Sequence, residues 1–384
     1  MDRRSFLHSA ALFAGGAFLG GPSVRMGLAA PVPGVGPYGA LGAANSDGLQ
    51  LPVGFTSRLI AVSGQTVANT SYKWHAAPDG GACIAHAAGG WVYVSNGEAG
   101  KGVGSVGAIA FDAQGAIVDS YAILTGSSRS CSGGMTPWGS YLSGEENGSA
   151  GRVFECNPFA PSQGVHRPGL GAFGHEMIAV DVATGNVYMV EDHSSGRLYR
   201  FVPTRAGDLT AGQLYAAKVA SGHVSWVPVS ATAPDRSFTT TAFGGAEGLW
   251  IMGDVAYFTT KLDVRVWRLD LTRNLLSVFY DYAATPGSSL DAVDNVVGHA
   301  PSRDLFVAED GGNLEVGLLT TAGPATVAPF LRFVGHDQSE VSGIAFTPDG
   351  TRLYVSSQRG TDGATGRTYE VSGPFRRLPR DVVA

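Results

Sequence analysis

The chain has 384 residues, with 26 Lys or Arg against 32 Asp or Glu and a formal net charge of −6. This acidic balance, without a basic patch, argues against nucleic acid as a partner. The chain has 55 glycines, and apolar residues at helical spacing are nearly absent after the N-terminal stretch, which predicts a loop-rich, all-β protein.

The N-terminus has the features of a twin-arginine signal peptide. Arg3 and Arg4 precede Ser-Phe-Leu, and a mildly apolar stretch follows over 6–21. The stretch is too short for a permanent anchor, and a Sec signal with a chance arginine pair is the alternative. We therefore expect the twin-arginine export machinery as a partner, a periplasmic or secreted location, and no stable membrane anchor after cleavage.

The predicted organisation has three parts. Residues 1–30 form the signal peptide, 31–48 an N-terminal linker, and 49–384 a single β-domain with an insertion around 204–240. Three cysteines are an odd number for an exported protein. One disulfide and one free thiol are expected, and an exported free thiol suggests a ligand role.

A short pattern recurs along the chain: a turn with Gly or Asp, an alternating apolar strand, and a polar or acidic end. It lies at 89–96, 138–146, 184–192, 253–261, 302–310 and 349–357. Its central positions are Val92, Tyr141, Val187, Ala256, Leu305 and Leu353, at intervals of 49, 46, 69, 49 and 48 residues.

A period of about fifty residues is that of a propeller blade. The long third interval contains the insertion, and the segments 196–201 and 264–269 read as further, half-buried antiparallel strands. Six occurrences predict a six-bladed β-propeller. A β-sandwich with chance repetition is the alternative.

Charged residues follow the recurring strand in most repeats. They are Glu98, Glu145, Glu146, Glu191, Asp192, Lys261, Glu309 and Asp310. In equivalent strands these side chains would meet at one level around the axis, where carboxylates repel unless they are protonated or bound to cations. Oxygen ligands of this kind suit Ca²⁺, Mg²⁺ or oxidised iron.

Other acidic residues stand in turn-rich motifs, and each taken singly reads as a solvated strand end. Glu176, Glu247, Asp294 and Glu340 belong to this group. The Asp-Gly pairs at 79–80 and 349–350 are predicted to be turns.

The motifs resemble those of the PhoX-type alkaline phosphatases. The longest is Cys-Ser-Gly-Gly-Met-Thr-Pro-Trp-Gly-Ser-Tyr-Leu-Ser-Gly-Glu-Glu-Asn at 131–147. Supporting segments lie at 174–181, 191–203, 245–250, 257–261, 294–295 and 309–311, in the order of the family. The resemblance runs from about residue 50 to the C-terminus.

This resemblance implies a six-bladed propeller with a mixed cluster of Fe³⁺ and Ca²⁺ at one end of its channel. It implies phosphate monoesters as substrates and hydrolysis by the metals rather than by a covalent protein nucleophile. Cys131 would be a thiolate ligand of iron, and Asp294 and Asn295 would be ligands of calcium. The remaining predicted metal ligands are the carboxylates Glu98, Glu146, Glu176, Glu247 and Glu309.

The chain departs from the family pattern at three places. An arginine two residues before the position of Glu247 is replaced by Gly245, and a glycine cannot grip phosphate as a guanidinium does. Lys261, the predicted catalytic residue, or Arg359 would compensate. The family's Asn-His-Glu is Asn-Gly-Glu at 96–98, and Gly144 stands where relatives often have Cys.

The sequence therefore predicts an exported metal-dependent hydrolase that acts on a small phosphorylated substrate. Two alternatives stay open at this point. One is a calcium-dependent lactonase or esterase on the same scaffold, which the loss of arginine at Gly245 favours. The other is a non-catalytic propeller stabilised by metal that binds a partner or a glycan.

Overall fold

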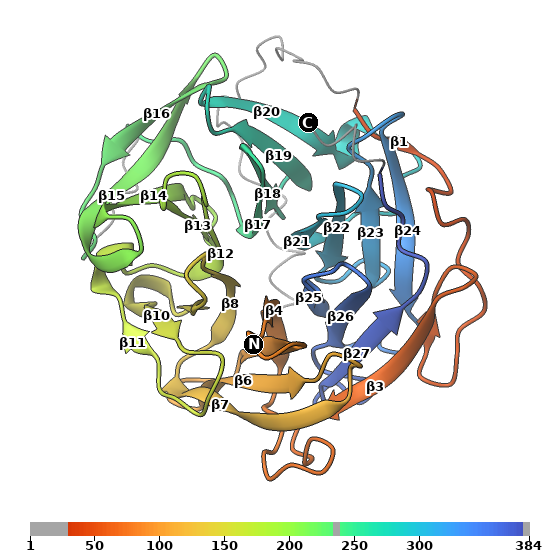
Figure 1. Cartoon of the computed structure of the whole chain (residues 1–384). Coiled ribbons are helices and arrows are strands. Elements are labelled where there is room, and N and C mark those ends of the chain that lie inside the picture. The colour runs from red at the N-terminus through yellow and green to blue at the C-terminus, as the bar shows by residue number, and fades with distance from the viewer. Residues whose placement is uncertain (1–29, 233–238, 379–384) are drawn as a thin grey trace.

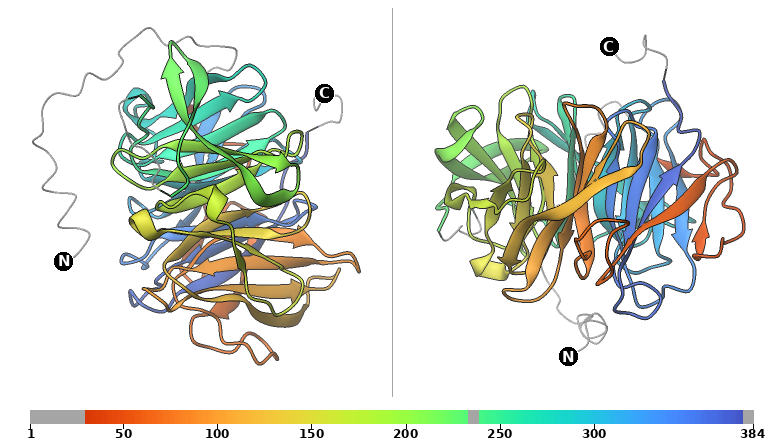
Figure 2. Two further views of the ribbon diagram at one scale, coloured as in Figure 1. Left: turned by 90° about the vertical axis from the view of Figure 1, so that its left-hand side faces the viewer. Right: turned by 60° about the horizontal axis from the view of Figure 1, so that its bottom comes forward.

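The computed structural model describes residues 30–232 and 239–378. Within them the chain forms strands and three 3-10 helices, η1 (Gly148–Ala150), η2 (Pro168–Leu170) and η3 (Tyr282–Ala284). The sheets stand around a central axis in a propeller-like ring, which Figure 1 shows along the axis and Figure 2 from two further sides. The predicted all-β class is confirmed.

The predicted signal peptide, except for its last residue, lies outside the described residues. The domain bounds predicted from the sequence stay predictions. Among the described residues, no helix combines the length and hydropathy needed to cross a membrane.

Two sheets are four-stranded meanders in chain order. The first contains β4 (Pro78–Ala85), β5 (Trp91–Gly97), β6 (Gly104–Phe111) and β7 (Ile117–Ser127). The second contains β8 (Ser130–Met135), β9 (Tyr141–Glu145), β10 (Val153–Cys156) and β11 (Val165–His166).

Two further sheets combine distant parts of the chain. One contains β21 (Val293–His299), β22 (Asp304–Glu309), β23 (Glu315–Leu319) and β24 (Thr326–Phe333), with β1 (Val32–Pro33) and β2 (Leu49–Gln50) paired to β24. The other contains β25 (Val341–Phe346), β26 (Arg352–Ser357), β27 (Arg367–Ser372) and β3 (Thr56–Val62).

The fifth sheet has nine strands where two blades were expected. It contains β12 (His175–Val180), β13 (Val187–Glu191), β14 (Leu198–Arg205), β15 (Asp208–Ala220), β16 (His223–Pro228), β17 (Ala246–Met252), β18 (Val255–Thr260), β19 (Arg265–Asp270) and β20 (Leu275–Asp281). The runs β12–β15 and β17–β20 each form a four-stranded meander, and β16 joins them through one pair, His223 and Leu275. The hydrogen bonds thus form five sheets where the sequence predicted six blades.

The recurring strand of the sequence is the second strand of each antiparallel pair that lines the axis: β5, β9, β13, β18, β22 and β26. All residues of the first five are buried. Both faces of these strands pack on neighbouring sheets, which is why the strands are rich in Val, Tyr and Phe.

The apolar core lies between adjacent sheets. One cluster joins Val92 and Val94 of β5 to Tyr141 of β9, and another joins Ile60 of β3 to Tyr93 and Tyr354. Cys83 and Cys156 are buried in these clusters, and all three cysteines of the chain are free. The expected disulfide is therefore absent, since the two buried thiols belong to different apolar clusters.

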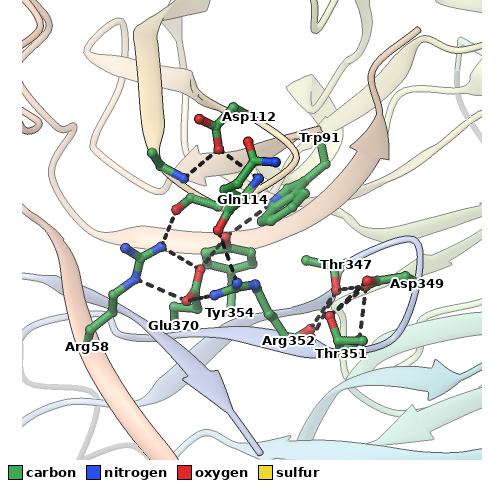
Figure 3. A network of polar contacts seen from close by, with 12 residues as sticks. Arg58, Trp91, Asp112, Gln114, Thr347, Asp349, Thr351, Arg352, Tyr354 and Glu370 are labelled. Atoms are coloured by element: carbon green, nitrogen blue, oxygen red, sulfur yellow. Dashed lines mark hydrogen bonds and ion pairs between the residues drawn. The ribbon is translucent and has the colours of Figure 1, made fainter. Parts of the chain in front are cut away.

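The ring closes where β3 from the N-terminal part pairs with β27 from the C-terminal part. Glu370 of β27 is buried and accepts two hydrogen bonds of 3.0 Å from the Arg58 guanidinium of β3. Arg352 and Tyr354 of β26 donate to the same carboxylate at 2.6 and 2.8 Å (Figure 3). This network joins three strands of the closing sheet.

The same network reaches the neighbouring sheet. Arg58 donates to the carbonyl of Gly115 at 2.7 Å, in the turn between β6 and β7. Trp91 of β5 donates its indole N–H to the Tyr354 hydroxyl at 3.1 Å, as Figure 3 shows. One buried carboxylate thus fixes both the closure of its own sheet and the contact with the first meander.

We predict that Glu370→Gln destabilises the fold by about 1.5 to 3 kcal/mol near neutral pH, because it replaces a buried carboxylate that accepts charge-assisted hydrogen bonds from the partly exposed Arg58 and Arg352. Burial raises the pKa of Glu370, but hydrogen bonds from Arg58, Tyr354 and Arg352 outweigh it and hold this pKa below its ordinary value. Urea unfolding of the variant and of an exposed control, Asp254→Asn, measures the difference.

The difference in the free energy of unfolding between wild type and Glu370→Gln should depend on pH in one direction. A carboxyl whose pKa is lowered in the folded state stabilises above its unfolded pKa of about 4.3, and the stabilisation is lost as the pH falls through the folded value. The gap between wild type and Glu370→Gln should therefore narrow below about pH 4. A gap that is constant or widens in acid would contradict the ion-pair account.

Candidate metal centre

The first strand of each axial pair is irregular at its start. In the described residues, register shifts lie at 78–81 in β4, 130–133 in β8, 175–178 in β12, 246–249 in β17, 293–296 in β21 and 342–345 in β25. Such bulges re-aim the side chains beside them. The second residue of each strand, which we call the first ring, is Asp79, Cys131, Glu176, Glu247, Asp294 or Ser342.

The residue directly after each second strand forms a second ring: Glu98, Glu146, Asp192, Lys261, Asp310 and Gln358. Each donates its backbone N–H to the carbonyl of the residue before or at the start of the first strand, at 2.8 to 3.2 Å. The two rings therefore meet at the same end of every strand pair. This repeated backbone geometry gathers ligand-type side chains from all parts of the chain.

Three groups of these side chains have ligand atoms within 4.8 Å of one another. The first is Asp79, Glu98 and Cys131; the second is Cys131, Glu146 and Glu176; the third is Glu176, Asp192 and Glu247. Cys131 and Glu176 are shared, so the groups form one continuous arc over the pairs of β4, β8, β12 and β17.

Without a bound cation, the acidic side chains of the arc repel one another when they are ionised. Burial, followed by repulsion from Glu247 and Glu146, raises the pKa of Glu176 well above its usual range. Burial and the neighbouring carboxylates also raise the pKa values of Asp79 and of the Cys131 thiol. Burial and the nearby Glu98, opposed by Arg129, raise the pKa of Glu146 to about 8.

The residues fit a bound cation. In the second group the buried Oε2 of Glu176 has no hydrogen-bond partner in the described part of the chain, and the Cys131 Sγ atom lies 3.5 Å from Oδ2 of Asp79. A cation would satisfy the orphaned oxygen and offset the repulsion. A thiolate among carboxylates suits iron, and carboxylate oxygens alone suit calcium.

Lys261 lies at the edge of the third group. Its Nζ atom is 2.5 Å from Oε1 of Glu247, 3.7 Å from Oδ2 of Asp192 and 3.9 Å from Oδ2 of Asp310. Burial alone would lower the pKa of Lys261, but Glu247, Asp192 and Asp294 raise it well above its usual range. The side chain is thus a fixed ammonium among carboxylates.

Two guanidinium groups complete the rings. Arg129 contacts Glu98 at 3.1 Å and Glu146 at 2.5 Å, so it bridges the first and second groups. Arg359 contacts Glu340 at 3.1 Å beside the β25–β26 pair, and the adjacent Gln358 donates to Oδ2 of Asp79 at 2.6 Å. Neither arginine is fully buried, with side-chain exposures of 35% and 31%.

The structure brings most predicted site residues to these rings. Cys131, Glu98, Glu146, Glu176 and Glu247 all belong to the three donor groups. Asp294 lies in the first ring, and burial raises its pKa to about 7 against the opposing charge of Lys261. Asn295 follows it in β21 and donates to its Oδ1 at 2.8 Å.

Glu309 does not reach the rings. Its Oε1 and Oε2 atoms accept the backbone N–H groups of Asp291 and Glu315, both at 2.9 Å, inside the sheet. Because side chains alternate along a strand, the following residue, Asp310, points to the axis instead. Glu309 therefore stabilises the backbone at Asp291 and Glu315. Asp310 occupies the ring position that the sequence predicted for Glu309.

The prediction of a turn at Asp79-Gly80 was wrong. Asp79 is buried in β4, and a Cβ atom at Gly80 would lie 2.0 Å from Oγ of Ser132 in β8. The glycine is required for this close approach of two strands rather than for a turn. The other pair behaves as predicted, because Asp349 accepts hydrogen bonds from Thr347 and Thr351 in the turn before β26.

The spacing between the two rings in the sequence could have identified Asp79 as a site residue. Each residue of the first ring precedes its partner in the second ring by 14 to 19 residues, and Asp79 stands 19 residues before Glu98. Asp192 and Asp310 were noted as acidic strand ends but not predicted as ligands. The spacing assigns them to the second ring together with Glu98.

We predict that Asp79→Asn lowers the metal content of the purified protein, because a neutral amide is a weaker ligand and offsets less cation charge. Asp349→Asn is the matched control, since it alters the other Asp-Gly pair and should leave metal content unchanged. Elemental analysis of both variants makes the test. Equal metal content in the two would show that Asp79 is not part of the centre.

Comparison with known proteins gives one family match. The family model described as "Alkaline phosphatase PhoX" matches residues 80–152 and 148–245. These segments contain Cys131, Glu176 and most of the arc. No curated protein sequence matches the chain.

A solved structure shares the fold at low identity. Pseudomonas fluorescens PhoX in complex with vanadate, described as a transition-state analogue, has a TM-score of 0.69 and 16% identity over 86% of this chain and 97% of that one. A candidate 6-phosphogluconolactonase from Bacteroides uniformis (TM-score 0.44, 14% identity, 73% and 78% covered) and the calcium-binding protein regucalcin from Agrobacterium tumefaciens (0.39, 19%, 78% and 92%) are more distant. Residues 80–245 of the chain are thus similar to the PhoX family of alkaline phosphatases, and the fold is similar to that of a PhoX protein.

Proposed function

We propose that the protein is an exported, metal-dependent phosphomonoesterase with its metal centre at one end of the propeller axis. The observation that carries the proposal is the arc of three overlapping donor groups, built around a thiol, in a chain whose residues 80–245 match the PhoX family model. We also interpret the nine-stranded sheet as two blades joined at the rim by β16, which gives six blades in total.

The donor chemistry supports a division of the centre between two kinds of metal. Cys131, Glu146 and Glu176 would hold Fe³⁺, because a thiolate with carboxylates suits iron. Asp79 and Glu98 would hold Ca²⁺ through oxygen atoms. Glu247, Asp294 and Asn295, predicted as further ligands from the sequence, extend the same surface toward β17 and β21.

The cations would supply Lewis-acid stabilisation for the charge that develops on the phosphoryl group. The chain itself contributes positioning. The Arg129 guanidinium, held between Glu98 and Glu146, is partly exposed beside the donor groups and is suited to bind phosphate oxygens. The vanadate complex of the structurally similar Pseudomonas protein supports a small phosphorylated substrate for this site.

Position 245 is a glycine and supplies no guanidinium for phosphate, so a lactonase or esterase is an alternative function. A lactonase or esterase needs no second guanidinium, and it would use the same oxygen-rich end of the axis. A non-catalytic metal-stabilised propeller would retain the metals without turnover. Assays on aryl phosphates, lactones and aryl esters with one metal-loaded preparation separate the three functions.

We predict that protein isolated with its native metals releases phosphate from a generic aryl phosphate. Full metal occupancy without turnover on a panel of phosphate monoesters would contradict the proposal. The assay should use protein recovered from the exported fraction, where the metal content reflects the cellular route of assembly.

Cys131→Ala tests the iron ligand directly. We expect this variant to lose iron and the visible absorption of a thiolate–iron bond, because no other thiol lies in the donor groups. Cys156→Ala is the matched control: Cys156 is buried in an apolar cluster, so its loss costs stability but leaves iron content unchanged. Unchanged iron in Cys131→Ala would refute the ligand role.

A further inference from the structure

Lys261 is the one cationic side chain in the second ring of the described residues. The equivalent positions carry Glu98, Glu146, Asp192, Asp310 and Gln358. Its ammonium group contacts Glu247 at 2.5 Å, lies within 3.9 Å of Asp192 and Asp310, and interacts electrostatically with Asp294. A single positive charge is thus placed where four carboxylates converge.

The fold has a specific provision for this lysine. Gly245 has a φ of +59°, and a Cβ atom added to it would lie 2.8 Å from Cγ of Lys261. The backbone N–H of Lys261 donates to the Gly245 carbonyl at 2.8 Å. The lysine stem therefore occupies the space that any side chain at position 245 would need, and the glycine lets the ammonium reach the carboxylates.

The lysine and a metal ion would compete for the same oxygens. Of the three residues in the third donor group, Glu247 and Asp192 are also partners of Lys261. A cation with three N–H donors and nearby carboxylates has its charge already compensated, so little of that charge is left for a substrate phosphate. The first two groups have an arginine instead: Arg129 contacts Glu98 and Glu146, one carboxylate of each group, whereas Lys261 contacts two of the three residues of the third group.

We propose that Lys261 is the resident cation of the third donor group and keeps a metal ion out of it. This inference rests on the metal centre proposed above and changes its extent. The metals occupy the first and second groups, which share Cys131, and the lysine neutralises the carboxylates of the third. Lys261 then sets the number of bound metals, whereas the sequence predicted a catalytic role for it.

Lys261→Gln tests the proposal, because it removes the ammonium and leaves the carboxylates of Glu247, Asp192 and Asp310 in place. We expect calcium content, measured by elemental analysis, to rise by about one ion per chain. The melting temperature of the variant should become dependent on added CaCl₂, since the ion binds the folded state only. The wild type should show no such added calcium.

Two controls define the result. Lys218→Gln removes an exposed lysine of β15 and should leave the metal content unchanged. Lys261→Arg retains a positive charge and should also gain no calcium. Extra calcium in either control would show that the gain does not come from the vacated third group, and would overturn the proposal.

The outcomes also separate this inference from the proposed function. Equal metal content in Lys261→Gln and wild type, with a raised KM for an aryl phosphate, would overturn the inference and return Lys261 to a substrate contact. A variant that stays unfolded at every calcium concentration would overturn it as well, because calcium would then not replace the ammonium. A wild type that holds no metal while Lys261→Gln gains calcium would instead refute the proposed metal centre.

Discussion

Repulsion among buried carboxylates at one end of the propeller axis is the constraint on which the rest of this structure depends. Burial and neighbouring carboxylates raise the pKa values of Glu176, Glu146 and Asp79, so the set is stable in its charged form only with cations nearby. The fold supplies some of this charge itself through Arg129, Lys261 and Arg359. The remainder is what we assign to metal ions.

The architecture explains why these groups meet at all. Every axial strand pair begins with a bulge and a repeated backbone hydrogen bond, and these place one side chain from each strand at the same level. The ring holds that geometry only if it is closed, and the closure depends on β3, β27 and the buried Glu370 between them. A residue far from the site therefore contributes to it by keeping the sheets in register.

Much of the fold could be predicted from the sequence, because the second strand of each pair is buried on both faces and repeats with a period near fifty residues. The number of sheets could not be predicted, because the long β15–β16 hairpin joins two meanders through a single residue pair. Five predicted ligands lie in the donor groups: Glu98 and Glu146 directly follow second strands, and Cys131, Glu176 and Glu247 are the second residues of first strands.

The misplaced residues have local physical causes. Asp79 was read as part of a turn because Asp-Gly usually forms one, and only the contact of Gly80 with Ser132 shows why a glycine lies in a strand. Glu309 was predicted as a ligand in place of its neighbour Asp310. Because side chains alternate along a strand, Glu309 points into its own sheet and Asp310 points to the axis. The partners of Lys261 come from three different sheet segments, so no local pattern could reveal them.

Elemental analysis of the wild-type protein recovered from the exported fraction tests the central claim most directly. The account predicts iron and calcium together in each chain, with iron lost in Cys131→Ala. Protein that is folded and free of both metals, or that holds calcium without iron, would contradict it.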